Sequence, residues 1–123
     1  MALAAPICEL ILHEHRYRPI AGDSLFVGRQ TVPLSPKIHE RPLARHGLQN
    51  ADKGPVEYDE ETRYSQGKDY ISDRYFMRSL GVERFYALDV TDYEGADIVH
   101  DLGLPIGDEH KHAFARRRKV RFP

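Results

Sequence analysis

The chain has 123 residues, a formal net charge of −1 and 41% hydrophobic residues, a length and composition that predict one globular domain with a modest core. No apolar run approaches the roughly 20 residues of a membrane helix. The mildly apolar start has no basic segment before it, which argues against a signal peptide. We therefore expect a cytoplasmic protein.

Cysteine and histidine give no indication of a redox or metal site. The single cysteine, Cys8, has no partner for an internal disulfide, and we expect an inert apolar residue in a reducing compartment. The seven histidines show no HExxH spacing, and no CxxC occurs. No Gly-x-Ser-x-Gly sequence indicates a nucleophilic serine. We predict neither a metal centre nor a serine hydrolase.

The first part of the chain predicts a helix, a strand and a second helix. Apolar residues spaced along 7–16 indicate one face of a helix. Residues 24–32 are rich in β-forming residues and predict a buried strand. Ser35 followed by Pro36 is typical of a helix start, and Pro42 is expected to break or kink the helix that follows.

The second part predicts a loop, a helix and two strands. Residues 49–69 are polar, acidic and dotted with glycine and proline, which predicts a long loop or a mobile insertion. Residues 71–81 predict a short helix that ends at Gly81. Strands are predicted over 82–90 and 96–99. Alternating helices and strands favour an α/β fold with a mostly parallel sheet.

Three residues at predicted strand ends are candidates for ligand binding. Asp89 either accepts two hydrogen bonds from the hydroxyls of a ribose or caps a turn. Asp101 either accepts a hydrogen bond from the amine of adenine or forms a turn before Gly103. Gly28 either lets a ligand approach the backbone closely or is an ordinary turn glycine.

Two charged features lie beside these candidates. Arg29 and Gln30 are close enough to Gly28 to reach a ligand carboxylate, but we expect both side chains to be solvated on the surface. Bases dominate 110–123, which is typical of a disordered tail or of a nucleic-acid-binding arm. Between these two we favour the disordered tail.

The second and third predicted strands resemble those of class I S-adenosylmethionine-dependent methyltransferases. The segments that carry the resemblance are Phe-Tyr-Ala-Leu-Asp at 85–89, Ala-Asp-Ile-Val-His-Asp at 96–101 and Leu-Pro-Ile at 104–106. The resemblance implies S-adenosylmethionine as the cofactor, with its ribose on Asp89 and its adenine against Asp101 and Leu102. It also implies that Gly28 stands in for the glycine-rich loop of the family.

The implied fold is a partial Rossmann-like, doubly wound α/β sheet of mostly parallel strands, incomplete on its C-terminal side. We expect residues 1–109 to form this methyltransferase-like domain, with 49–69 as a polar loop or insertion and 110–123 as a basic tail. The family's fourth strand and substrate cap have no counterpart in the sequence. We interpret this as a truncated or frameshifted methyltransferase with weak or no activity alone, and we name no catalytic residue and no methyl acceptor.

The partners expected are the small-molecule cofactor and, through an exposed sheet edge, a second copy of the chain. No membrane partner is expected. The alternative function is a non-catalytic interaction module that uses its basic tail to bind an acidic partner or nucleic acid. In that case Asp89 and Asp101 only shape turns.

Overall fold

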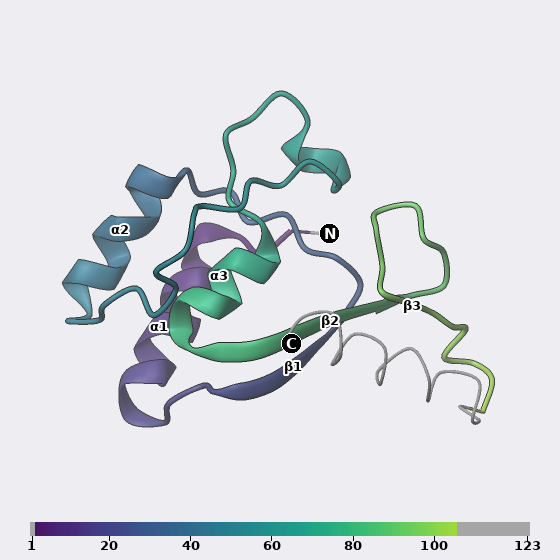
Figure 1. Cartoon of the computed structure of the whole chain (residues 1–123), viewed down its shortest axis with the longest axis horizontal. Coiled ribbons are helices and arrows are strands. Elements are labelled where there is room, and N and C mark those ends of the chain that lie inside the picture. The colour runs from purple at the N-terminus through teal and green to yellow at the C-terminus, as the bar shows by residue number, and fades with distance from the viewer. Residues whose placement is uncertain (1, 106–123) are drawn as a thin grey trace.

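The structure is a computed structural model of the whole chain and describes residues 2–105. The prediction of a basic tail at 110–123 lies outside the described residues. The elements in chain order are α1 (Ala5–Tyr17), β1 (Gly22–Val27), α2 (Pro36–Arg45), the 3-10 helix η1 (Arg63–Ser65), α3 (Asp73–Leu80), β2 (Val82–Asp89) and β3 (Ile98–Val99). Figure 1 shows the three α-helices on one side of the strands.

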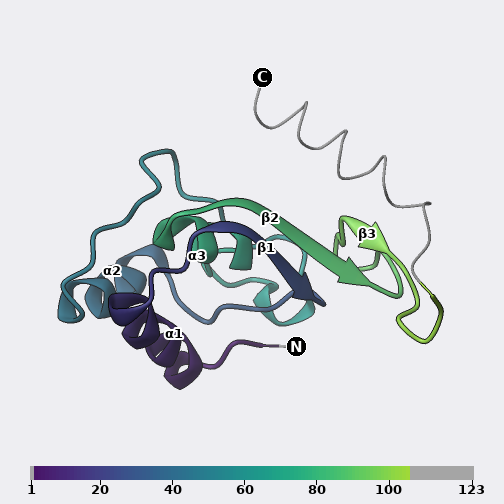
Figure 2. The same ribbon diagram turned by 90° about the horizontal axis from the view of Figure 1, so that it is seen from below.

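The strands form a three-stranded parallel sheet in the order β1-β2-β3. The register aligns Val27 of β1 with Leu88 of β2, and Asp89 of β2 with Val99 of β3. Seen from below, β1 and β2 lie side by side with α3 behind them (Figure 2). The prediction of an α/β fold with parallel strands is therefore confirmed for a small sheet.

Local sequence explains both ends of α3. The Ser72 side chain accepts a hydrogen bond from the backbone N–H of Tyr75, which caps the first turn. The helix stops at Gly81, whose φ of +114° is a left-handed conformation that favours glycine. The helix predicted within 71–81 is confirmed.

Pro42 does not end α2, so of the predicted break or kink the break does not occur. The helix begins at the Ser35 cap and continues beyond Pro42 to Arg45. The hydrogen bonds on either side of the proline persist, because His39 N–H donates to the Ser35 carbonyl and His46 N–H donates to the Pro42 carbonyl. Pro42 is also buried, and its packing offsets the missing backbone donor.

The strand predicted over 24–32 is shorter and begins earlier than expected. It ends at Val27 because Gly28 adopts a φ of +85° and turns the chain out of the sheet. Arg29 then leaves the strand direction and enters a buried ion pair. The residues after Gly28 therefore do not continue the strand. Arg29 packs within the connection from β1 to β2 instead.

The core lies between the helices and one face of the sheet. Phe85 of β2 packs edge-on against Phe26 of β1, with ring centroids 4.8 Å apart. Cys8 of α1 is buried in the same cluster, and burial raises the pKa of its thiol to about 11. Leu25 and Val27 alternate with Phe26 and point to the other face, where both are exposed.

The polar segment 49–69 is a loop with one short 3-10 helix, and it is anchored to the core. Asp59, Thr62 and Ser65 are all buried. Asp59 Oδ1 accepts hydrogen bonds from the backbone N–H groups of Glu61 and Thr62 at 3.0 Å. This network gives the loop a defined conformation beside the sheet.

Candidate ligand-binding site

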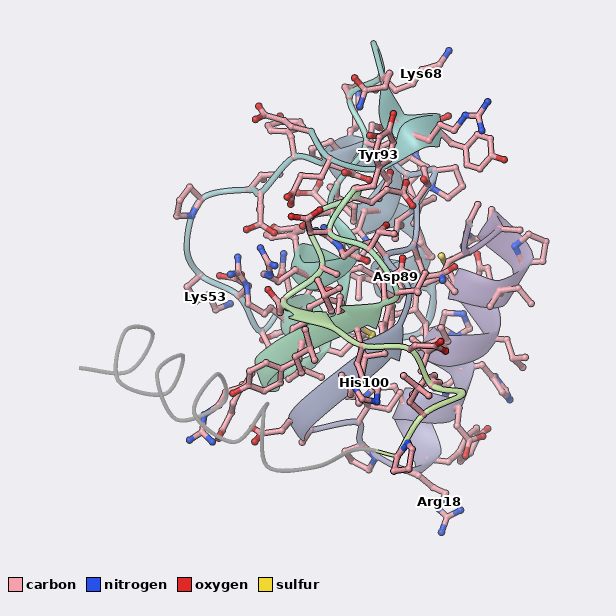
Figure 3. All side chains as sticks on the ribbon, turned by 90° about the vertical axis from the view of Figure 1, so that its right-hand side faces the viewer. Arg18, Lys53, Lys68, Asp89, Tyr93 and His100 are labelled. Carbon is pink, nitrogen blue, oxygen red and sulfur yellow. The ribbon has the colours of Figure 1, made fainter. Side chains whose placement is uncertain are left out.

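A pocket of about 360 Å³ lies where β1 and β2 end. It is lined by Val27, Gly28, Arg29, Leu88, Asp89, Val90, Glu94, His100 and Leu102. Its volume falls within the roughly 300–1,000 Å³ of small-molecule sites. The carboxyl ends of parallel strands are also where α/β sheets bind their ligands. Figure 3 looks onto this end of the molecule and labels Asp89 and His100.

A larger hollow, of about 820 Å³, lies around the start of β2. It is walled by residues 51–57 and by the end of α3, where Arg78 Nε donates to Asp52 Oδ2 at 3.0 Å. This hollow is at the amino end of β2, away from the carboxyl strand ends. We place the candidate site in the smaller pocket because of its position in the sheet and the residues it gathers.

Gly28 and Asp89 line the pocket where β1 and β2 end. The Gly28 N–H donates to the Leu88 carbonyl at 2.7 Å, which holds the turn after β1 against the end of β2. Asp89 is half-buried, and its Oδ1 accepts the backbone N–H of Val90 at 2.7 Å. Within residues 2–105, Asp89 Oδ2 has no hydrogen-bond donor, so it is available to a ligand.

Leu102 and Asp101 occupy different positions despite being neighbours. Leu102 lines the pocket. Asp101 is exposed outside the lining, and its Oδ1 accepts the backbone N–H of Gly103 at 2.8 Å. Of the four residues predicted to bind a cofactor, the structure thus brings Gly28, Asp89 and Leu102 together and sets Asp101 in a turn at the side.

Arg29 is buried, so the expectation that it is solvated is wrong. Only 2% of the residue is exposed. Its Nε and Nη2 donate to Asp73, and its Nη1 donates to Glu61 Oε1 at 2.8 Å. Burial alone would lower the pKa of the guanidinium, but hydrogen bonds and attraction from Asp73 and Glu61 outweigh it and raise the pKa above its ordinary value.

The pairing of Arg29 with Asp73 and Glu61 determines which charges of the pocket lining remain without an ionic partner within residues 2–105. The charge of Arg29 is met by two carboxylates, which leaves Asp89 and Glu94 as the acidic groups of the lining. Val27, Leu88 and Leu102 supply apolar surface. Carboxylate acceptors beside apolar walls suit a ligand that has both hydroxyl or cationic donors and a flat apolar part.

Asp97 is a structurally important acid that the sequence reasoning did not single out. Its side chain is buried, with Oδ2 accepting the Ala87 N–H at 2.8 Å while its own N–H donates to the Ala87 carbonyl. Asp97 thus fastens the start of β3 to β2. The only local sign of this role is an acid directly before the apolar pair Ile98-Val99.

The described residues contain neither a candidate metal site nor a candidate membrane-spanning helix. Over residues 2–105, no group of three or more His, Cys, Asp or Glu side chains is placed to hold a metal ion. In the same part of the chain, no helix combines the length and the apolar character needed to cross a bilayer.

The sequence matches no protein-family profile, and neither a curated protein nor a solved structure matches the chain.

Proposed function

We propose that the chain is a class I S-adenosylmethionine-dependent methyltransferase-like protein that binds this cofactor at the ends of β1 and β2. The observation that carries the proposal is the meeting of Gly28, Asp89 and Leu102 in one pocket. The motif resemblance assigns these three residues to a single cofactor site, although Gly28 is far from the other two in sequence. Three parallel strands with helices on one face also suit one part of a doubly wound sheet.

Asp89 is the proposed ribose ligand. Its Oδ2 has no donor among residues 2–105, and its Oδ1 keeps a lone pair beyond the one used by Val90. A carboxylate in this state can accept hydrogen bonds from both hydroxyls of a ribose. The half-buried position strengthens such bonds because less water competes for them.

The adenine is proposed to lie on the apolar side of the pocket, over Leu102 and Val90. Asp101 would reach its amine through Oδ2, since Oδ1 is used by Gly103. When bound, the cofactor supplies a methyl group activated by its sulfonium. The residues of this chain bind and orient it, a positioning effect. Within residues 2–105 we assign cofactor contacts and no base for a methyl acceptor.

The test is a calorimetric titration of the purified chain with S-adenosylhomocysteine, repeated with Asp89→Ala. We expect saturable binding by the wild type and at least tenfold weaker binding by the variant, since a hydrogen bond to a charged group contributes about 1.5–3 kcal/mol. Asp92→Ala is the matched control, because Asp92 is an exposed acid in the following loop that does not line the pocket.

Two outcomes would overturn the proposal. One is the absence of binding by a cooperatively folded wild-type chain. The other is equal weakening by Asp89→Ala and Asp92→Ala, which would mean that the ligand responds to overall charge rather than to the pocket.

A further inference from the structure

One wall of the pocket is held from behind by the 49–69 loop. Glu94 lines the pocket from the connection between β2 and β3. Its Oε2 accepts the backbone N–H of Arg63 at 2.7 Å, and its carbonyl accepts Arg29 Nη1 at 3.3 Å. The position of this pocket residue is therefore set by groups from the loop and from the end of β1.

Glu61 of the 49–69 loop contacts both Arg29 and the backbone at Gly95. Its Oε1 accepts from Arg29 Nη1 at 2.8 Å, the same nitrogen that reaches the Glu94 carbonyl. Its carboxylate also fills the space beside Gly95, where a Cβ would come within 1.8 Å of Glu61 Oε2. Gly95 has a φ of +76°, so this tight approach uses a backbone conformation that favours glycine.

The contacts of Glu61 with Arg29 and Gly95 can be removed without removing the buried Arg29–Asp73 ion pair. Asp73 is fully buried and takes Nε and Nη2 of Arg29, so the buried charge pair survives without Glu61. The Glu61 side chain itself is 48% exposed. Removing it leaves Arg29 paired with Asp73 and takes away one hydrogen bond to Arg29 Nη1, while residues 90–95 lose their contact with the Glu61 carboxylate.

We propose that Glu61 is a positioning residue for the ligand pocket. Through Arg29 and through its contact with Gly95, it holds residues 90–95 so that the wall containing Val90 and Glu94 keeps its position beside Asp89. The identity of the ligand rests on the proposed function, whereas the order of residues 90–95 can be measured without any ligand.

The test compares Glu61→Ala with Glu60→Ala. Glu60 is the adjacent exposed glutamate, and its carboxylate has no hydrogen bond or ion pair within residues 2–105. Amide hydrogen exchange is measured on both variants, with attention to Gly95, whose N–H donates to the Asp92 carbonyl at 2.9 Å. We expect about tenfold faster exchange over 90–95 in Glu61→Ala alone.

A second readout is the dissociation constant for S-adenosylhomocysteine. We expect it to rise about 5- to 30-fold in Glu61→Ala and to stay at the wild-type value in Glu60→Ala. Glu61→Gln keeps an oxygen acceptor for Arg29 and should give an intermediate value. A purely structural role would not produce this graded order at an unchanged unfolding midpoint.

The outcomes separate the two proposals. Faster exchange confined to 90–95 supports the positioning role even if the wild type does not bind S-adenosylhomocysteine, in which case the proposed function alone fails. Unchanged exchange over 90–95, or faster exchange spread over the whole chain, overturns the positioning role.

Discussion

His39 is a buried histidine whose neighbours favour its neutral form. Its Nε2 lies 3.1 Å from Ser79 Oγ, and the Ser79 hydroxyl donates to the Phe76 carbonyl at 2.6 Å. The serine oxygen must therefore accept, which puts the ring proton on Nε2. His39 Nδ1 has no hydrogen-bond partner among the described residues. Burial lowers the pKa of His39 to about 4.

This histidine predicts a pH-dependent stability. In the unfolded chain His39 is protonated below its ordinary pKa of 6.5. In the folded chain its pKa is about 4, so it is protonated only at lower pH. The stabilisation is therefore fully present above pH 6.5 and is lost as the pH falls towards 4, by at most about 3 kcal/mol. Urea unfolding between pH 4 and 7 should show this loss. His39→Leu should flatten the profile, whereas His13→Gln, at an exposed position, should leave it unchanged. An equally steep profile in His39→Leu would contradict the assignment.

The Arg29–Asp73 pair is predicted to be essential for folding stability. Arg29→Ala leaves the carboxylate of Asp73 buried without its cation, and such a loss costs about 3–5 kcal/mol. Arg45→Ala removes an ion pair with Glu9 in which Arg45 is mostly exposed, and should cost less than about 1 kcal/mol. Urea unfolding of the two variants at pH 7 measures the difference. Similar losses in both would show that burial does not distinguish the two pairs.

At the scale of the element, α3 and β2 could be predicted because their signals are local. Ser72 and Gly81 bound the helix, and the second half of β2 is an apolar run that ends in Asp89. The end of β1 could not be predicted in the same way. Gly28 is compatible with both a strand and a turn, and the partner that draws Arg29 inward is 44 residues away in sequence. Glu61 contacts Arg29 across 32 residues of sequence, and such a long-range contact explains why the sequence indicated Asp89 and Leu102 but not Glu61.

Gly81 gives a prediction at this scale. Alanine at a φ of +114° is strained, although its Cβ would meet only the Ile20 carbonyl at an ordinary 3.9 Å. Gly81→Ala should therefore destabilise the protein by about 1–2 kcal/mol through backbone conformation alone. Gly81→Asn should cost less, because asparagine tolerates positive φ better. Thermal unfolding of both variants tests the order, and an equal or larger loss in the asparagine variant would contradict this explanation.

At the scale of the whole molecule, the sheet has a long edge at β1. Within residues 2–105, β1 pairs only with β2, and Leu25 is 50% exposed on the face opposite the helices. Exposed edge strands pair with other chains unless charge or cover prevents it. We therefore expect association that increases with protein concentration.

Leu25→Lys should reduce this association, because a lysine on an edge strand opposes pairing. Leu10→Lys is the control, since Leu10 is similarly exposed but lies on α1. Sedimentation velocity over a range of concentrations measures both variants. A wild-type chain that stays monomeric throughout, or an equal effect of the two lysines, would argue against β1 as the contact.

The connection from β2 to β3 has a consequence for ligand exchange kinetics. Parallel strands are usually joined by about a dozen or more residues that include a helix. Here residues 90–97 make the crossing with no helix, and β3 pairs with β2 over only two residues. β3 is therefore expected to detach in brief openings that leave the core intact. Since Leu102 lies three residues after β3 and lines the pocket, each opening would displace one of its walls and speed the release of a bound molecule without unfolding of the whole protein.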